Sequence, residues 1–193
     1  MADFLVCYGT GEGQTAKVAA AIEADLAARG HEVTTVDLTE LPPTLDVTAF
    51  DAVLVGASIH MGTHQKHVAA FVRENRRELA SRPSGFFQVC LSSAVEDEAR
   101  QLEAARYVEE FVEKTSWHPD RVASFAGAIR YSEYGLLKRV MMKKIASEAT
   151  GDTDTSRDYE YTDWDAVDEF AVGFAEFVEG ESAAGEPDAA TAR

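Results

Sequence analysis

Short apolar runs alternate with longer amphipathic segments along most of this chain, and no other sequence feature constrains the fold as strongly. Five short runs predict strands, and all but the second are mostly apolar, which is typical of strands buried on both faces. They lie at residues 4–8, 32–37, 52–57, 85–91 and 121–128. Apolar residues recur at helical spacing over about 14–29, 64–79, 96–115 and 165–178. Strands that alternate with helices in this way predict a parallel sheet covered by helices on both faces.

The order of these strands follows from the handedness of their connections. Right-handed crossovers leave few topologies for five parallel strands, and we expect the doubly wound order 2-1-3-4-5. A ligand then binds at the carboxyl ends of the strands, where strands 1 and 3 diverge. Cys7 and Cys90 would lie about two strand spacings, or roughly 10 Å, apart, which is too far for a disulfide. We expect one α/β domain over 1–178, with an insert at 129–160 near the fifth strand.

Charge and hydropathy exclude several classes of function. The 193 residues carry 34 acidic and 18 basic side chains, a net charge of −16, which argues against nucleic acid as a partner. No apolar run approaches the ~20 residues of a membrane span, and the N-terminus lacks a basic signal-peptide region, so we expect a cytoplasmic protein. The dispersed acidity indicates a high-salt cytoplasm, although an acidic protein from an ordinary cytoplasm is the alternative. Residues 179–193 are Ala-, Gly- and Glu-rich, and we expect a disordered tail.

The loop that follows the first strand has the composition of an anion site. Residues 8–15 hold three alternating glycines, which let the backbone approach a ligand, and hydroxyl donors at Thr10 and Thr15. The amide groups at the start of the following helix favour an anion, so the loop is predicted to hold one phosphate group. No lysine follows the glycines, which excludes a Walker loop, and the glycine spacing does not fit the dinucleotide fingerprint. An ordinary glycine-rich turn is the alternative.

The segment Thr10-Gly-Glu-Gly-Gln-Thr15 resembles the phosphate loop of flavodoxins. The resemblance implies a flavodoxin-like fold that binds FMN through its 5′-phosphate. It assigns the phosphate contacts to six consecutive residues: Thr10, Gly11, Glu12, Gly13, Gln14 and Thr15. Glu12 departs from the flavodoxin pattern, because it places a carboxylate beside the expected phosphate, and we expect its side chain to point into solvent.

Two further loops follow strands at the same edge of the predicted sheet. In the flavodoxin arrangement the loop after the third strand flanks the isoalloxazine ring, and the loop after the fourth strand forms the other wall. The first loop would contribute Ser58, Ile59, His60, Met61 and Gly62, with His60 or Met61 packed on the ring. The second would contribute Ser92 and Ser93 as hydrogen-bond partners. The alternatives are a solvent-exposed loop histidine and serines without a binding role.

Four later blocks make the resemblance more specific, because simple flavodoxins lack them. They are Trp117-His-Pro-Asp-Arg121, Ala126-Gly-Ala-Ile-Arg-Tyr131, Gly151-Asp-Thr-Asp-Thr155 and Tyr161-Thr-Asp-Trp164. With the earlier loops they resemble the menaquinone-dependent protoporphyrinogen IX dehydrogenase family over about residues 3–178. That resemblance implies an FMN enzyme of haem biosynthesis. The enzyme takes six electrons from protoporphyrinogen IX in two-electron steps and passes them to a quinone at the membrane.

The insert carries an independent indication of a membrane surface. Residues 129–150 hold five basic residues and two acidic ones, the reverse of the rest of the chain. On a helix over 136–146, one face would combine Leu137, Val140, Met141 and Ile145, with Lys144 breaking the apolar side. A short basic amphipathic helix of this kind can lie in the interface of an anionic membrane, although it is too short to span one. The alternative is that the helix packs on the acidic surface of its own domain.

Residue roles in the reaction follow from side-chain chemistry and from the resemblance. His60 is the candidate acceptor of a pyrrole proton. Arg130 would pair with a porphyrin propionate, and Tyr131 and Tyr134 would stack on the macrocycle. A salt bridge for Arg130 and ordinary packing for the tyrosines are the alternatives.

Two other functional classes compete with this reading. They are a one-electron carrier of the flavodoxin type and a quinone-reducing flavoprotein with a different electron donor. We expect no metal in the site, and the oligomeric state, a homo-oligomer included, stays open.

Overall fold

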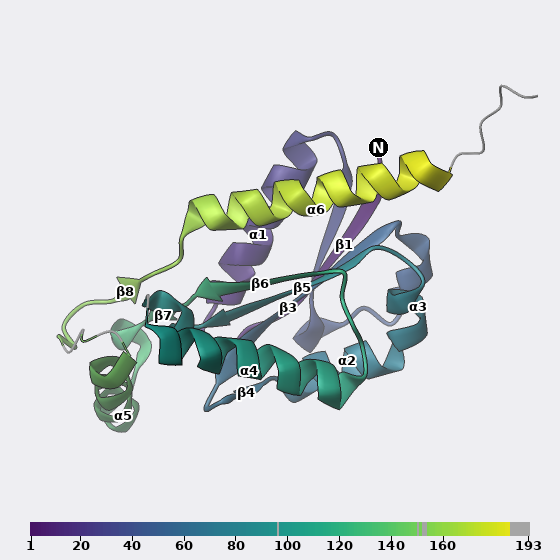
Figure 1. The fold of residues 1–193 in the computed structure, drawn as a ribbon. Coiled ribbons are helices and arrows are strands. Elements are labelled where there is room, and N and C mark those ends of the chain that lie inside the picture. Colours follow the sequence, from purple (N-terminus) through teal and green to yellow (C-terminus); the bar gives the residue numbers. More distant parts are fainter. Residues whose placement is uncertain (96, 150, 152–153, 186–193) are drawn as a thin grey trace, which may run out of the picture.

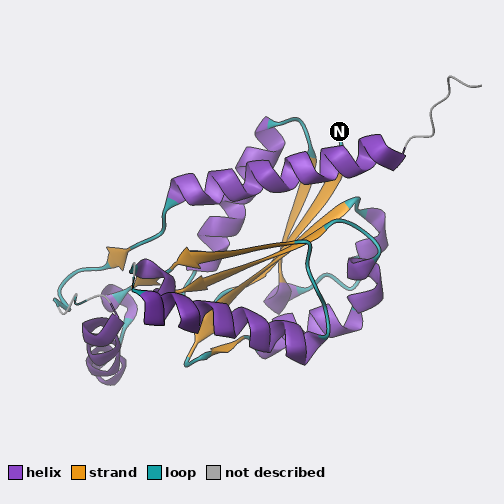
Figure 2. Cartoon of the chain, in the orientation of Figure 1, coloured by secondary structure: helices purple, strands orange, loops and turns teal. Residues whose placement is uncertain are grey.

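The structure is a computed structural model that describes residues 1–95, 97–149, 151 and 154–185, and a parallel sheet lies at its centre. Five parallel strands form it in the order β2-β1-β3-β5-β6, which confirms the predicted order (Figures 1 and 2). These strands are β1 (Asp3–Gly9), β2 (Glu32–Asp37), β3 (Ala52–His60), β5 (Ser84–Cys90) and β6 (Arg121–Ala126). The short β4 (Thr63–His64) folds back antiparallel on β3, and β7 (Ala128–Ile129) pairs with β8 (Tyr159–Glu160) outside the main sheet.

Helices cover both faces of the sheet, as the alternating pattern predicts. The α-helices are α1 (Gln14–Ala28), α2 (Lys66–Glu74), α3 (Arg76–Ala80), α4 (Glu98–Thr115), α5 (Leu136–Ala149) and α6 (Trp164–Gly185). Four 3-10 turns join them to the strands, η1 (Leu38–Glu40), η2 (Val47–Ala49), η3 (Leu91–Ala94) and η4 (Tyr131–Glu133). In Figure 1, α1 and α6 lie on one face, while α2, α3 and α4 lie on the other. The architecture is therefore a doubly wound, flavodoxin-like α/β sandwich.

Each face of the sheet buries its own apolar core. On the α1/α6 side, Phe4 packs edge-on against Phe174, with their ring centroids 5.9 Å apart. On the other side, Phe86 stacks on Phe111 at 4.5 Å and meets Trp117 edge-on. Because both faces of β1, β3 and β5 are buried, these three central strands read as nearly continuous apolar runs, whereas the edge strands β2 and β6 are more exposed and more polar.

Close packing of helices and rings on the sheet requires small residues in the strands. A Cβ added at Gly56 would lie 2.2 Å from the Phe87 ring, well inside van der Waals contact. A Cβ at Gly9 would lie 2.4 Å from a methyl group of Val68. Gly9 therefore has a packing role beside its position at the start of the loop between β1 and α1.

The segment expected as one helix over 64–79 is divided in the structure. His64 belongs to β4, and a hydrogen bond from Asn75 Nδ2 to the Phe71 carbonyl oxygen marks the break between α2 and α3. Asparagine side chains compete for backbone groups in this way and favour helix ends. The apolar face of α2, with Val68, Phe71 and Val72, is buried as its spacing predicts.

The last helix is longer than its apolar pattern indicates. Asp163 accepts hydrogen bonds from the backbone N–H groups of Asp165 and Ala166 and so caps the N-terminus of α6. The helix continues to Gly185, and Glu179 pairs with Arg29 and His31. This corrects the expected start of the tail at 179, because charge pairing extends the helix where apolar packing ends. The rest of the expected tail, 186–193, lies outside the described residues.

The insert forms a small core of its own at the carboxyl end of the sheet. Ile129, Tyr131, Tyr134, Met142 and Ala146 are buried together there. The helix α5 contacts the protein through Met142 and Ala146, whereas Val140 is 70% exposed. Val140 was expected on one apolar face with Leu137, Met141 and Ile145, but its side chain is exposed and does not pack on the domain. The side chains of the other three residues lie outside the described part of the structure. Within the described part of the chain, no helix combines the length and hydropathy needed to cross a bilayer.

Candidate functional site

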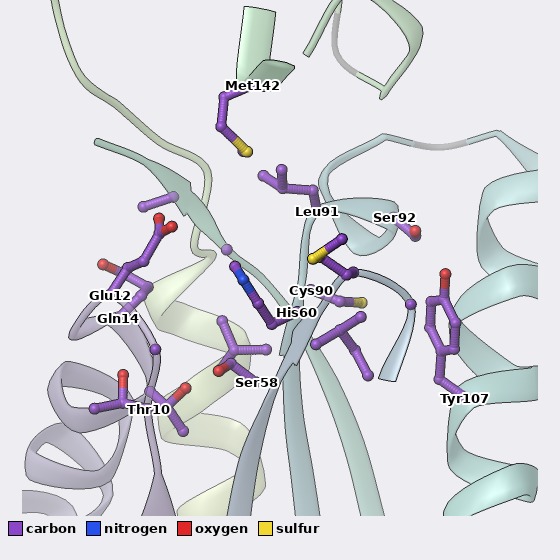
Figure 3. Close-up of a pocket in the computed structure, with 18 of the residues that line it drawn as sticks. Thr10, Glu12, Gln14, Ser58, His60, Cys90, Leu91, Ser92, Tyr107 and Met142 are labelled. Carbon is purple, nitrogen blue, oxygen red and sulfur yellow. The ribbon is translucent and has the colours of Figure 1, made fainter. Parts of the chain in front are cut away.

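A pocket of about 220 Å³ opens at the carboxyl ends of β1, β3 and β5, where the topology predicts a ligand. Three segments that the sequence singled out line it together (Figure 3). From the first loop come Thr10, Gly11, Glu12, Gln14 and Thr15. From the second come Ser58, Ile59, His60, Met61 and Gly62, and from the third comes Ser92. The parallel sheet gathers these loops because all its strands end at the same edge.

The first loop has the geometry of an anion cradle. Gly13 is the N-cap of α1 with φ of +85°, a conformation that glycine adopts without a steric penalty. Thr10 Oγ1 accepts a hydrogen bond from the Gly13 amide at 2.8 Å and holds the turn closed. The amide groups that follow begin the helix, where the helix dipole favours negative charge.

Two buried polar atoms at this loop lack hydrogen-bond partners among the described residues. They are Thr15 Oγ1, in a side chain that is fully buried, and Gln14 Oε1. The other amide atom of Gln14 donates to Thr162 Oγ1 at 2.8 Å, so the side chain is fixed. Unsatisfied buried polar atoms are costly and rare in native proteins. A hydroxyl donor and an amide acceptor facing a pocket suit a ligand with a phosphate and hydroxyl groups, as FMN has.

The second loop is a tight hairpin between β3 and β4. Met61 and Gly62 occupy its two central positions with φ of +50° and +78°, as in a type I′ turn. Met61 is 79% exposed at the rim of the pocket, and His60 is exposed beside it. Gln65 accepts a hydrogen bond from the Ser58 amide at 3.1 Å and also contacts the Ser58 hydroxyl, which fixes the base of the hairpin.

A buried polar network anchors the same hairpin to the sheet. Gln88 Nε2 donates to the Ala104 carbonyl at 2.7 Å and to Ser124 Oγ at 2.8 Å. Gln88 Oε1 therefore accepts from His64 Nε2 at 3.0 Å, which fixes the imidazole tautomer. Burial lowers the pKa of His64 to about 4, with a further lowering from the charge of Lys114. At neutral pH the His64 side chain is therefore uncharged, and its hydrogen bond to Gln88 holds the hairpin on the sheet.

The third wall contains a charged cluster that the sequence analysis missed. Glu103 accepts hydrogen bonds from Ser92 Oγ at 2.7 Å, Arg100 Nη1 at 3.0 Å and Tyr107 OH at 3.1 Å. These bonds, the Ser92 bond first, lower the pKa of Glu103. The spacing of Arg100, Glu103 and Tyr107 along α4 was the available signal, but it resembles an ordinary exposed helix face.

Other predicted residues lie at or near the third wall. Cys90 lines the pocket, and burial raises the pKa of its thiol. Ser93 Oγ lies 3.1 Å from the Cys90 sulfur and is not among the lining residues. Cys7 and Cys90 are both free and buried, as expected.

The insert borders the pocket beside the first loop. Met142 reaches the pocket from α5 (Figure 3). The Tyr134 hydroxyl donates to the Glu12 carboxylate, so Glu12 does not simply point into solvent as expected. Arg130 lies beside the first loop, with Nη2 4.0 Å from the position of a Cβ at Gly13. Tyr131 is fully buried under α5, where it packs against Tyr134 and Tyr159.

The sheet order, the glycine turn and the pocket at the diverging strands define a flavodoxin-like protein. The sequence profile of the flavodoxin domain matches residues 5–156. A short-chain flavodoxin associated with a PDU bacterial microcompartment superposes with a TM-score of 0.57 at 14% identity, covering 92% of this chain and 99% of that one. An oxidised flavodoxin from Bacillus cereus gives 0.53 at 18% identity, covering 91% and 99%. These two likenesses concern the fold.

Sequence relatives define the family more narrowly. Protoporphyrinogen IX dehydrogenase (quinone) of Escherichia coli K12 is 35% identical over 169 residues, which are 86% of this chain and 91% of that protein. The protein of the same name from Leishmania major is 36% identical over 126 residues, 65% of this chain and 54% of that protein. The chain belongs to this family of flavodoxin-fold oxidoreductases, the protoporphyrinogen IX dehydrogenases.

Proposed function

We propose that this protein binds FMN and oxidises protoporphyrinogen IX to protoporphyrin IX with a quinone as electron acceptor. The observation that carries the proposal is the Thr15 hydroxyl, which is fully buried in the first loop and has no hydrogen-bond partner among the described residues. The chain that carries it is 35% identical to a protein of that name. Menaquinone is the acceptor and haem biosynthesis the setting that the family resemblance suggests.

The first loop is suited to the phosphate of FMN. Thr10, Gly11, Gly13 and Thr15 would hold the phosphate oxygens through backbone N–H groups and hydroxyls. Gln14, whose Oε1 is unpartnered, would accept from a hydroxyl of the ribityl chain. Ser58, Ile59, His60, Met61, Gly62 and Ser92 would surround the flavin ring, with Ser93 supporting the wall through Cys90.

The chain's own groups position the donor and handle its protons. Each of three steps removes two electrons and two protons from the porphyrinogen, and three quinones become three quinols, so the overall reaction balances. FMN, when bound, supplies two-electron chemistry that amino-acid side chains lack. His60, exposed at the pocket, is the proposed acceptor of the pyrrole proton. Met142 and Leu91 provide apolar surface that excludes water from the inner pocket.

The proposed route to the quinone is through α5. Lys143, Lys144 and Val140 are exposed, while Met142 faces the pocket from the same helix. A helix that presents basic and apolar groups outward can lie on an anionic membrane surface. We therefore propose a cytoplasmic protein that associates peripherally with the inner face of the cell membrane. This geometry would bring a membrane-dissolved quinone close to the cofactor.

Anaerobic reduction of the bound flavin tests the proposal. Purified holoprotein is mixed with protoporphyrinogen IX in the absence of oxygen, and menaquinone is added afterwards. We expect loss of the flavin absorbance with the first addition and its return with the second. His60→Asn should slow the first step more than the second, because only the first needs an acceptor for the pyrrole proton.

The same experiment separates the two competing functions. A one-electron carrier would ignore porphyrinogen and accumulate a stable semiquinone when titrated with dithionite. A quinone reductase with another donor would be reoxidised by menaquinone without being reduced by porphyrinogen. Either result would overturn the proposed substrate, and a protein that binds no FMN would overturn the cofactor.

A further inference from the structure

We infer that the insert completes the phosphate site, with Arg130 supplying the positive charge that the first loop lacks. The inference rests on the proposed binding of FMN. It assigns Arg130 to the cofactor phosphate, in place of the substrate carboxylate that the sequence analysis expected.

The first loop carries no positively charged side chain of its own. Its eight residues, 8–15, include no lysine or arginine, and they include the carboxylate of Glu12. A phosphate monoester carries nearly two negative charges at neutral pH. Lys17, one turn into α1, pairs with Glu160 at 2.5 Å. The charge of Arg130 also acts on the Asp158 carboxylate, whose pKa is lowered chiefly by its hydrogen bond from Ser132. Without a basic side chain, the N-terminus of α1 would bind the phosphate dianion while the Glu12 carboxylate lies next to it.

Arg130 lies where the missing charge is needed. Its Nη2 atom is 4.0 Å from the position of a Cβ at Gly13, the N-cap of α1. Glycine at this position leaves the space between guanidinium and backbone open. The unpartnered Thr15 hydroxyl belongs to the first turn of the same helix. Guanidinium groups bind phosphate oxygens through paired, charge-assisted hydrogen bonds.

The neighbouring residues hold Arg130 and Glu12 in this arrangement. The Tyr134 hydroxyl donates to the Glu12 carboxylate and lies 3.3 Å from the Arg130 backbone nitrogen, which donates to it. Tyr134 itself is buried in the core of the insert. One side chain thus ties the acidic residue of the loop to the start of the insert. Placement of Arg130 at the cradle therefore depends on a docked insert.

Comparing FMN with riboflavin tests this assignment, since the two ligands differ only in the phosphate. The full-length protein is stripped of flavin and titrated with each ligand while quenching of flavin fluorescence is followed. We expect Arg130→Met to raise the Kd for FMN at least about tenfold and to leave the Kd for riboflavin unchanged. Arg130→Lys should recover part of the affinity. Arg157→Met removes an exposed arginine of the same insert and should change neither value.

Two results would overturn the inference while leaving the proposed cofactor intact. One is an unchanged FMN affinity in Arg130→Met. The other is an equal loss for both flavins, which would make Arg130 a purely structural residue of the insert. If the unmodified protein binds FMN no better than riboflavin, the proposed phosphate site fails together with the inference.

Limited proteolysis provides a second readout, because binding couplings are reciprocal. If the phosphate pairs with Arg130, FMN must in turn stabilise the docked insert. We expect FMN, and not riboflavin, to slow cleavage within 130–160, and this difference to vanish in Arg130→Met. Equal protection by both flavins in the unmodified protein would overturn the coupling.

Discussion

Nε2 of His64 lies 3.0 Å from Oε1 of Gln88, and this buried hydrogen bond joins the hairpin at the rim of the pocket to strand β5. The hairpin carries His60 and Met61, so its position relative to the sheet sets the shape of the pocket. The bond requires a proton on Nε2, which the neutral and the charged imidazole can both supply, whereas burial of the ring favours the neutral form and lowers the pKa of His64. The protonation of His64 therefore affects both the stability of the fold and the geometry of the pocket.

The buried histidine predicts a specific dependence of stability on pH. The pKa of His64 is lowered to about 4 in the folded protein, below about 6.5 when unfolded. The unfolded chain thus binds more protons between these values, and the free energy of unfolding falls as pH drops from about 6.5 to 4. The contribution is on the order of 3 kcal/mol. Urea unfolding of His64→Gln, which keeps a donor to Gln88, should show a shallower fall over this range. Parallel curves for the two proteins would contradict the prediction.

Gly56→Ala should destabilise the fold by crowding the Phe87 ring. The added Cβ would lie 2.2 Å from that ring, in a core without free space, and overpacking of this kind costs about 1–3 kcal/mol. Gly173→Ala is the matched control, since nothing lies within 4 Å of a Cβ there and alanine favours the helix. Thermal melting should show a lower Tm for the first variant and an equal or higher Tm for the second. Equal melting temperatures would contradict the prediction, because they would show that the side chains around Phe87 move enough to accept the added methyl group.

Thr15→Val separates cofactor binding from folding. The Thr15 hydroxyl is buried without a partner among the described residues, so its removal should leave the stability of the flavin-free protein unchanged or slightly higher. FMN affinity should fall about tenfold, because a hydrogen bond to a charged group is lost. Thr35→Val removes another buried, unpartnered hydroxyl, on β2 outside the pocket lining, and should not affect FMN. Fluorescence titration measures both, and a similar effect of the two substitutions would argue against a phosphate contact at Thr15.

The exposed lysines of α5 should contribute to membrane binding. Each basic residue near an anionic surface contributes about 1 kcal/mol, so replacing Lys143 and Lys144 by Gln should weaken vesicle binding about 30-fold. Lys66 and Lys114 are also exposed but lie on α2 and α4, and their double replacement is the control for net charge. Sedimentation with vesicles that contain phosphatidylglycerol measures the effect. Equal losses in the two double variants would indicate attraction by overall charge alone.

The sequence predicted the fold and most of the pocket lining because those features are local. The central strands β1, β3 and β5 show their burial as apolar runs, and each loop at the carboxyl edge follows directly from its strand. Because all the strands end at the same edge of the parallel sheet, the strand order alone predicts that Thr15, Ser58 and Ser92 lie around one pocket. Helix ends were less predictable where a side chain competes for the backbone, as at Asn75, or where distant charges extend a helix, as at Glu179.

Contacts between remote segments were not predictable from periodicity. The Glu103 cluster looked like an exposed helix face, and Arg130 looked available to a substrate. Only the folded chain places Arg130 beside Gly13 and Tyr134 beside Glu12. Local patterns fix which backbone segments form and which face each one buries. The partners of a polar side chain depend on how the insert docks on the sheet, and tertiary packing alone decides that arrangement.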